Sequence, residues 1–529
     1  MTIKDAYEKN ILLKDLTPYS DIDPCVAATD FLQGKCVLPH VGEVELLENG
    51  LVLWGREFLY NEKSSRLWLY SLVFVDYFVK SYAVKKDVTH LVCAVNIFCS
   101  FLEWMSQSSE HQNMVFQDEH SVCNRVLILI QFLNLLSVSD VNAEIKALEF
   151  KLSEHIYCCC NWLATDTYYA FNNHGVMMDR ALLNAYVFFR NRDASIEFWK
   201  DTAFRRISVM ISKTFDNDGC CTENSTSYHI LNVSLFNAVR KFSEKHNLDG
   251  LTPTFFNILE KAISAVALQV YENGSLPLIG DSYSKPSVYL SADYHKNIYG
   301  SELFSESGLF FLKQQEFYFS FKCGGLTTVH RHIDDTSITL QVKGINFICD
   351  GGMHSYDAKD PIRTILSSHL SHSGIFTEDC KHFRFKNYEN CRDISSILKY
   401  QQDHNFVTIK GVSNLDPEAL ITREIAVFSG NRINVVLVDD VESELDKVWR
   451  VQFLLHPDVS FAIRAGAVDL KCKGVTVTLI FSVSDSYTIT SELGYYSESF
   501  MGAQETSVIV VSGRSKRVNV KTFISCIDV

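Results

Sequence analysis

The amino-acid sequence predicts an α+β multidomain protein, with an N-terminal (α/α) toroid of helix pairs followed by a C-terminal antiparallel β-sandwich. Three observations lead to this prediction. The chain has 529 residues, which is more than a single hydrophobic core usually holds. Apolar residues recur at helical spacing up to about residue 300, and short alternating apolar segments follow. Turn-forming residues are concentrated between the two halves, at positions 274–286.

The first half carries apolar residues three and four positions apart, as one face of a helix requires. Such patterns cover residues 67–84, 88–105, 122–136, 143–164, 179–190, 196–215, 225–245 and 253–272. No strand-like segment separates them, so we expect successive helices to pack as antiparallel pairs, and an array of such pairs can close into a toroid. We place this domain at residues 1–300, with an N-terminal extension at residues 1–60.

The second half consists of short segments in which apolar and polar residues alternate. They cover residues 309–312, 317–321, 337–342, 346–349, 406–410, 423–428, 434–441, 449–455, 475–482, 507–511 and 518–523. Short strands at regular spacing are typical of an antiparallel sandwich. We place the β-sandwich at residues 301–529.

Composition excludes several classes of protein. The formal net charge of −14 argues against nucleic acid as a partner, because a broad basic surface is absent. The most apolar window, residues 67–84, contains Asp76 and Lys80, so we predict a buried helix and no membrane span. The cysteines include adjacent runs at 158–160 and 220–221 but no zinc-type CxxC pair, which favours free thiols. With no secretory signal at the N-terminus, a cytoplasmic location is expected, and a periplasmic or secreted one is the alternative.

The stretch from His330 to His372 constrains function most. His330 and His332 are two positions apart, Asp350 follows in the next predicted strand, and His372 follows a loop. Side chains two positions apart on a strand face the same side. His332, Asp350 and His372 can therefore converge on Zn²⁺, while His330 stays free for proton transfer. Scattered surface residues are the alternative interpretation.

Two polar segments stand out in the helical half. Asn172, Asn173 and His174 offer hydrogen-bond donors for a carboxylate, with a helix cap and turn as the alternative. In the segment 218–229, Tyr228 falls near the predicted start of a helix. A tyrosine placed there is a candidate proton carrier, with core packing as the alternative.

In this order, the three segments resemble the heparinase II/III-like superfamily of polysaccharide lyases, whose members include heparinases and alginate lyases. The resemblance rests on Asn172-Asn173-His174, Asp218-Gly219, Glu223, Ser225, Tyr228-His229, His330-Arg331-His332-Ile333-Asp334, Asp350-Gly351-Gly352, Ser355-Tyr356-Asp357 and His372. It covers residues 150–400 at the level of motifs and the whole chain at the level of architecture. The chain departs from the family pattern at Arg331, His354 and Ser373, where relatives often have Gly, Tyr and Asn.

The resemblance implies β-elimination on an acidic poly- or oligosaccharide that contains uronic acid. Asn173 and His174, helped by Arg331 or Arg363, would neutralise the carboxylate of the substrate. Tyr228 would protonate the leaving oxygen or also act as base, and His330 would be the base or its partner.

The resemblance also implies further binding residues and a metal. Substrate would be bound by Asn172, Glu223, His229, Arg331, Tyr356 and Arg363. One structural zinc ion per chain would be held by His332, Asp350 and His372, with His369 as a competing third ligand.

Two other functions stay open. A zinc-dependent hydrolase would use the same histidines and aspartate to activate water, and would release saturated products. A non-catalytic or synthesis-associated glycan-binding protein of a surface or capsule polysaccharide pathway would suit a cytoplasmic location. The oligomeric state is also open, with a homodimer as one option.

Overall fold

The computed structural model describes residues 2–16, 22–139, 147–285, 298–357, 359–387, 391–404, 406–428 and 433–526. Residues 143–146, with which one predicted helix begins, lie outside this part of the chain. The protein divides into two compact units. Unit 1 comprises Met1–Met210 and Val239–Thr252, and unit 2 comprises Ile211–Ala238 and Pro253–Val529.

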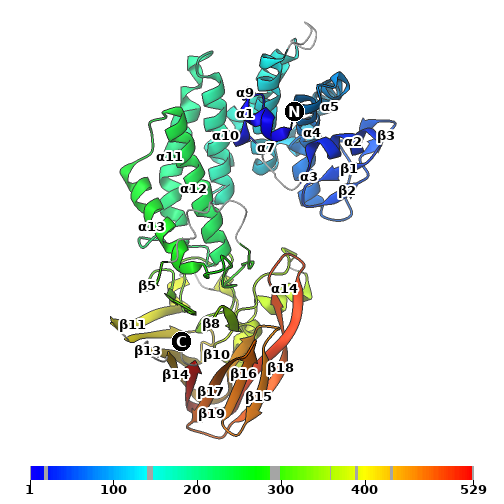
Figure 1. The fold of residues 1–529 in the computed structure, drawn as a ribbon. Helices are drawn as coiled ribbons and strands as arrows, with labels where there is room; N and C mark the ends of the chain where they lie inside the picture. The colour runs from blue at the N-terminus through cyan, green and yellow to red at the C-terminus, as the bar shows by residue number, and fades with distance from the viewer. Residues whose placement is uncertain are drawn as a thin grey trace. The chain divides into compact units, whose positions relative to one another are not determined.

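Helices make up most of the chain before residue 270, coloured blue to green in Figure 1. The helices are α1 (Ile3–Glu8), η1 (Lys14–Leu16), α2 (Pro24–Leu32), α3 (Glu62–Tyr70), α4 (Val73–Lys85), α5 (Val88–Ser106), α6 (Ser109–Val115), α7 (Glu119–Val138), α9 (Leu148–Ala164), η2 (Asp166–Tyr168), α10 (Asn173–Phe189), η3 (Ala194–Ile196), α11 (Glu197–Thr214), α12 (Thr226–His246) and α13 (Pro253–Gln269). Four short strands precede α3, namely β1 (Cys36–Leu38), β2 (Gly42–Val44), β3 (Leu47–Glu48) and β4 (Leu51–Val52). The helical half predicted from periodicity is confirmed.

Side-chain caps explain where several helices start. Asp87 accepts the backbone N–H of Thr89 at the start of α5, and Asp118 accepts that of Ser121 at the start of α7. One predicted helix is interrupted, because Leu72 has φ 63° and separates α3 from α4 with a bend of 49°. The window 67–84 therefore forms two buried helices instead of one.

In the described part of the chain, α5 and α7 are long and apolar enough to cross a membrane when judged by length and composition alone, and the bent pair of α3 and α4 also passes when taken as one span. In α7 the apolar window is mostly buried inside the protein, where it packs against α4, α9 and α10, whereas about a third of that of α5 is buried. The apolar residues of α7 thus belong to the core of unit 1. All sixteen cysteines are free and most are buried.

An antiparallel β domain begins at residue 300. Its strands are β5 (Gly300–Phe304), β6 (Leu309–Gln314), β7 (Phe317–Lys322), β8 (Ser337–Val342), β9 (Ile345–Cys349), β10 (Ile375–Thr377), β11 (Ser395–Asp403), β12 (Phe406–Ser413), β13 (Ala419–Phe428), β14 (Asn434–Leu455), β15 (Ser460–Arg464), β16 (Ala467–Cys472), β17 (Val475–Val483), β18 (Thr488–Ser497) and β19 (Ala503–Cys526). Helix α14 (Pro361–Leu366) and the short turns η5 (His369–Ser371), η6 (Glu378–His382), η7 (Phe385–Asn387) and η8 (Cys391–Asp393) lie between strands. The predicted fold class, helical region followed by antiparallel β domain, is confirmed.

Two long strands, β14 and β19, join the other strands of the β domain into one 15-stranded sheet. The strand order is β15-β16-β17-β19-β14-β9-β8-β7-β6-β5, and β13, β12 and β11 extend from β14. The first half of β19 pairs with β18 and its second half with β17, while β14 pairs with β19 on both sides of an irregularity between Glu442 and Lys447.

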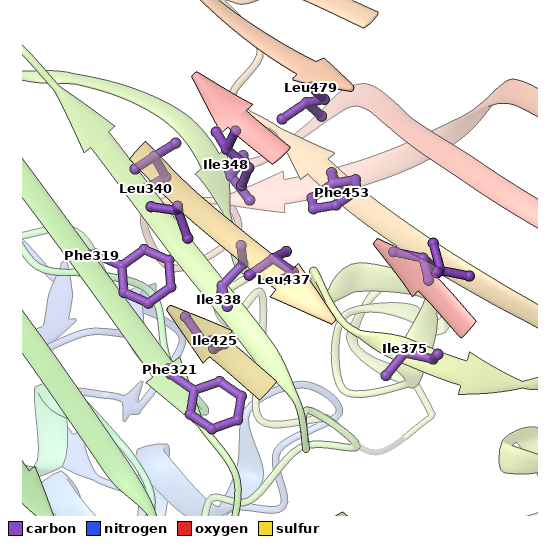
Figure 2. Packing of buried hydrophobic residues seen from close by; sticks show 14 of the residues in the cluster. Phe319, Phe321, Ile338, Leu340, Ile348, Ile375, Ile425, Leu437, Phe453 and Leu479 are labelled. Atoms are coloured by element: carbon purple, nitrogen blue, oxygen red, sulfur yellow. The ribbon is translucent and has the colours of Figure 1, made fainter. Parts of the chain in front are cut away.

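The core lies between facing strands (Figure 2). Phe319, Ile338 and Leu340 of β7 and β8 are fully buried, together with Leu437 and Phe453 of β14. In β12 buried and half-buried residues alternate, as expected for a strand with one face toward the core. This core supports two irregular segments, 323–336 and 350–374, that carry most of the predicted site residues of unit 2.

Candidate active site

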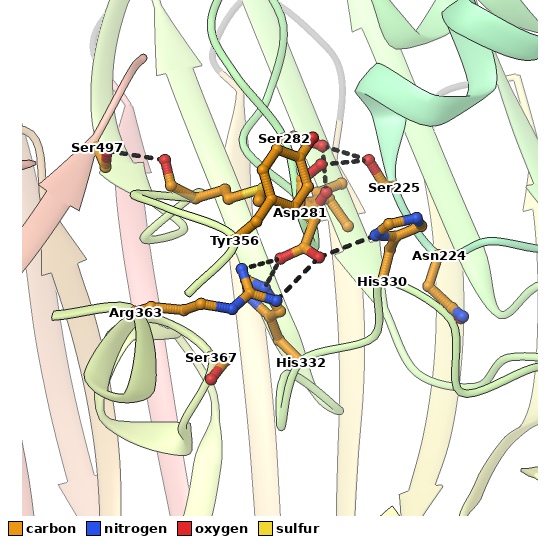
Figure 3. Close-up of polar contacts among 12 residues, drawn as sticks. Asn224, Ser225, Asp281, Ser282, His330, His332, Tyr356, Arg363, Ser367 and Ser497 are labelled. Carbon is orange, nitrogen blue, oxygen red and sulfur yellow. Dashed lines mark hydrogen bonds and ion pairs between the residues drawn. The ribbon is translucent and has the colours of Figure 1, made fainter. Parts of the chain in front are cut away.

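Three polar side chains of unit 2, those of His330, His332 and Arg363, converge on the carboxylate of Asp281 (Figure 3). The Asp281 carboxylate accepts a hydrogen bond from His330 Nδ1 on Oδ2 and one from His332 Nε2 on Oδ1, both at 2.9 Å. Arg363 donates from Nη1 to Oδ1 at 3.2 Å and from Nη2 to Oδ2 at 3.3 Å. Burial opposes ionisation of this carboxyl group, but the two histidines and the arginine outweigh it and hold the pKa of Asp281 well below its usual range. Asp281 is therefore a buried anion.

The backbone around Asp281 has an unusual conformation that brings the segments together. His330 has φ 55° and Gly280 has φ 60°. A Cβ atom at Gly280 would lie 2.3 Å from the carbonyl oxygen of Asn224 and 2.7 Å from that of His330, so only glycine fits. Asn224 Nδ2 also donates to the carbonyl oxygen of Val329 at 3.1 Å, which ties the loop before His330 to the start of α12.

Tyr228 lies in the first turn of α12, directly against His330. The two rings stack with centroids 3.6 Å apart and planes 18° apart. The Tyr228 hydroxyl is 3.1 Å from the Tyr356 hydroxyl. Burial, and then the neighbouring Tyr356, raise the pKa of Tyr228 well above that of a free phenol. Tyr228 is therefore a protonated phenol at neutral pH.

The two ring nitrogens of His330 have different partners, and only Nδ1 is hydrogen-bonded to Asp281. Nδ1 donates to Asp281, since a carboxylate can only accept, which leaves Nε2 as the basic nitrogen of the neutral ring. Nε2 lies 3.5 Å from Glu223 Oε2, beyond a short hydrogen bond. A histidine whose tautomer is fixed by an aspartate in this way is suited to accept a proton.

The predicted zinc ligands are arranged as histidine–carboxylate pairs. His372 Nδ1 bonds to Asp350 Oδ1 at 2.9 Å, and His332 bonds to Asp281. His332 Nδ1 and His372 Nε2 are buried without a hydrogen-bond partner in the described part of the chain. These two imidazole nitrogens are suited to coordinate a metal ion. The Asp350 carboxylate, however, already accepts hydrogen bonds from His372 and Ser337.

Among the described residues, a different group brings its ligand atoms within 4.8 Å of one another, namely Asp379, Asp416 and Glu418. The ligand atoms of the predicted zinc site do not converge to that extent. In the group that does converge, Lys447 Nζ contacts all three carboxylates at 2.8 to 3.1 Å and so supplies the positive charge. Zinc binding by His332, Asp350 and His372 stays a prediction.

Two residues assigned to substrate binding have other roles in the structure. The Arg331 side chain is fully buried, where it donates to Asp335 at 3.0 Å and to Ser395 Oγ at 2.7 Å. A buried guanidinium must be paired, and this pairing turns Arg331 away from solvent. His229 is buried too: its Nδ1 accepts the backbone N–H of Cys221 at 3.1 Å, and its Nε2 bonds the carbonyl oxygen of Ala262 at 3.0 Å. These contacts give both residues a structural role, and their assignment to substrate binding stays a prediction.

Asn172, Asn173 and His174 lie in unit 1, at the start of α10. Asn172 Oδ1 accepts the backbone N–H of His174 at 2.9 Å, so Asn172 is the helix cap that the alternative interpretation describes. His174 Nδ1 bonds to Glu119 Oε1 at 2.7 Å, and this bond lowers the pKa of Glu119. The His174 ring and the Asn173 residue are partly exposed and accessible to a ligand.

Sequence reasoning missed Asp281, the residue on which the site of unit 2 converges. In the sequence its segment carries only the signals of a turn. One sequence feature does point to Asp281: it is a charged residue that follows the apolar run 276–279 and is flanked by Gly280 and Ser282. A charge in such a segment is expected to be buried and paired.

Two family models match the chain. The model described as heparinase II/III N-terminus matches residues 60–309, and the model described as heparinase II/III-like, C-terminal, matches residues 299–524. No curated protein matches it. Among solved structures, the heparan sulfate lyase HepC from Pedobacter heparinus is similar, with a TM-score of 0.75, 16% identity, and coverage of 100% of this chain and 88% of that chain. A structure of heparinase III is similar with a TM-score of 0.80, 15% identity, and coverage of 100% and 91%.

Proposed function

Because this chain belongs to the heparinase II/III-like superfamily, we propose that it is a polysaccharide lyase acting on a glycosaminoglycan-like chain that contains uronic acid. The observation that carries the proposal is the stacking of a protonated Tyr228 on His330, whose Nδ1 is held by Asp281. These three groups supply a proton donor, a proton acceptor and an orienting carboxylate in one place. The solved structures of a heparan sulfate lyase and of heparinase III, which share the fold, support the substrate class.

His330 is the proposed base. In β-elimination the proton at C5 of the uronate, next to its carboxylate, is removed while the C4–O bond breaks, and the electron pair of the C–H bond forms the C4=C5 double bond. Nε2 of His330 accepts the C5 proton. Asp281 keeps the Nδ1–H in place and stabilises the imidazolium that forms, as the aspartate of a catalytic triad does.

Tyr228 is the proposed acid. Its raised pKa keeps the hydroxyl protonated at neutral pH, so Tyr228 has a proton to donate to the departing O4 and is disfavoured as the base. The Tyr356 hydroxyl at 3.1 Å can donate a hydrogen bond to the phenolate that remains. Transfer of the proton from His330 to Tyr228, directly or through water, then restores both groups for the next turnover.

Neutralisation of the substrate carboxylate needs a positive or hydrogen-bonding group. In unit 2, Arg363 is the candidate, since its side chain is 24% exposed while that of Arg331 is buried. In unit 1, Asn173 and His174 stand at the N-terminus of α10, where the helix dipole favours an anion. Both assignments are parts of the proposal, and Arg363→Ala and Asn173→Ala test them separately through an increase in KM.

The experiment that tests the proposed function is an absorbance assay on a panel of uronic-acid polysaccharides. Elimination creates a C=C bond conjugated to the carboxylate, which absorbs in the ultraviolet. A rise in absorbance with one of these polymers is expected. Saturated products that require a bound metal would instead indicate the zinc hydrolase, and binding without any product would indicate a glycan-binding protein.

A further inference from the structure

Two exposed aromatic side chains stand beside the proposed proton donor. Tyr356 is 60% exposed and Phe500 is 56% exposed. Their ring centroids are 6.5 Å apart and their planes are tilted by 31°, so the rings are neighbours but do not cover each other. Tyr356 in turn reaches the Tyr228 hydroxyl at 3.1 Å. The aromatic surface therefore ends at the atom that is proposed to protonate the leaving group.

Backbone hydrogen bonds fix the position of Phe500. It belongs to the hairpin tip between β18 and β19. The backbone N–H of Met501 donates to the carbonyl oxygen of His354 at 2.8 Å, and that of Ala503 donates to His354 Nδ1 at 3.3 Å. Ser497 Oγ donates to the carbonyl oxygen of Met353 at 2.8 Å (Figure 3). The tip is thus tied to the segment that leads into Tyr356.

The tip keeps apolar side chains in solvent at an energetic cost. Met501 adopts φ 55°, a conformation that is strained for a residue with a side chain, and it is 60% exposed. Adjacent exposed apolar side chains on a soluble protein often mark a binding surface. Hydrogen bonds hold the hairpin tip in place. Binding of a ligand therefore does not have to order the tip, which favours affinity.

We propose that Tyr356 and Phe500 form a binding subsite that stacks against the apolar C–H face of a pyranose ring next to the bond that is broken. The inference rests on the proposed lyase function and deepens it. A sugar fits this surface because its ring face is apolar while its hydroxyl groups stay in solvent at the edges. His354, which departs from the family pattern, is the positioning residue that holds the hairpin tip with its ring and its carbonyl oxygen.

The test compares steady-state kinetics of Phe500 variants on a uronic-acid polymer that the wild-type protein cleaves. Phe500→Ala and Phe500→Leu should each raise KM about fivefold with kcat unchanged, because a lost aromatic contact of this kind weakens ground state and transition state equally. Phe500→Tyr should keep the wild-type KM. Phe523→Ala removes a 39% exposed phenylalanine of β19, outside the hairpin tip, and serves as the matched control without effect.

The outcomes separate the two proposals. An unchanged KM in both Phe500→Ala and Phe500→Leu would overturn the subsite and leave the lyase proposal standing. A KM that rises in Phe500→Ala but is normal in Phe500→Leu would also overturn it, since bulk and not an aromatic ring would then suffice. Failure of the wild-type protein to form unsaturated product from any uronic-acid polymer would overturn both.

Discussion

Asp281 and Lys447 are two buried charges of unit 2 that are neutralised in different ways. Lys447 Nζ is surrounded by Asp379, Asp416 and Glu418, so each of its three N–H groups has a carboxylate to meet. Asp281 is held by donors whose remaining groups are not closed off by short hydrogen bonds: Nε2 of His330 lies 3.5 Å from Glu223 Oε2, and the guanidinium of Arg363 is partly exposed.

The difference between these two centres separates a structural charge from a catalytic one. The Lys447 centre is closed, because its donors and acceptors satisfy one another. The Asp281 centre is open, because it orients groups that can still act on a ligand. Removing a charge from the first should therefore affect stability, and removing a charge from the second should affect turnover.

The largest effect is expected for Asp281→Asn. An amide cannot hold the His330 tautomer or stabilise the imidazolium, so kcat should fall by roughly a thousandfold, within the range of general acid–base catalysis. Ultraviolet detection of product measures it. Asp416→Asn makes the same change at the Lys447 centre and should lower the free energy of unfolding while kcat stays within about twofold. Equal losses of kcat in the two variants would remove the distinction between the centres.

Gly280→Ala should reduce activity by up to about a hundredfold, since a misplacement of about 1 Å at a catalytic group can cost that much. The added Cβ would meet the carbonyl oxygen of Asn224 at 2.3 Å and push Asp281 away from His330. Gly344→Ala is the control, because Gly344 also has a positive φ of 72° but has nothing within 4 Å. If both variants lose activity alike, backbone strain and not close packing at Gly280 is the cause.

Lys447→Met should act on stability alone. Without the ammonium group, Asp416 is left as a buried and unpaired carboxylate, and breaking a buried pair costs about 3 to 5 kcal/mol. Denaturant unfolding measures this loss, and activity per folded molecule should match the wild type. A Lys447→Met protein with wild-type stability would show that the carboxylates do not need the cation.

The smallest effect concerns pH. The hydrogen bond from Lys447 lowers the pKa of Asp379, so this carboxylate stabilises the folded state above its unfolded-state pKa of about 3.9 and loses that contribution as the pH falls. The difference in the free energy of unfolding between wild type and Lys447→Met should be largest at neutral pH and should decrease below about pH 4. Unfolding curves across that range test it, and a constant difference would contradict it.

The sequence predicts the fold class well, because hydrophobic periodicity reports directly which face of a helix or strand is buried. It fails at Leu72, where a left-handed residue divides a continuous apolar pattern into two helices. Such a break depends on how the two helices pack and has no signature in periodicity.

The candidate site is only partly predictable for a related reason. Tyr228 and His330 are found from motifs, and the structure stacks them. The alternation argument for His330 and His332 does not apply, since both lie in a loop and His330 has φ 55°; they meet because each bonds a different oxygen of Asp281. Contacts between segments about fifty residues apart depend on tertiary folding, which is also why the burial of Arg331 was missed.

The measurement that tests the central claim most directly is the rate of unsaturated product formation by Tyr228→Phe on the best polysaccharide substrate. This change removes one oxygen atom and leaves the stacking on His330 in place. A loss of kcat of at least about a hundredfold, with the thermal stability of the wild type, is the result that general acid catalysis predicts. Wild-type activity in the correctly folded variant would contradict the assignment of Tyr228 as the proton donor.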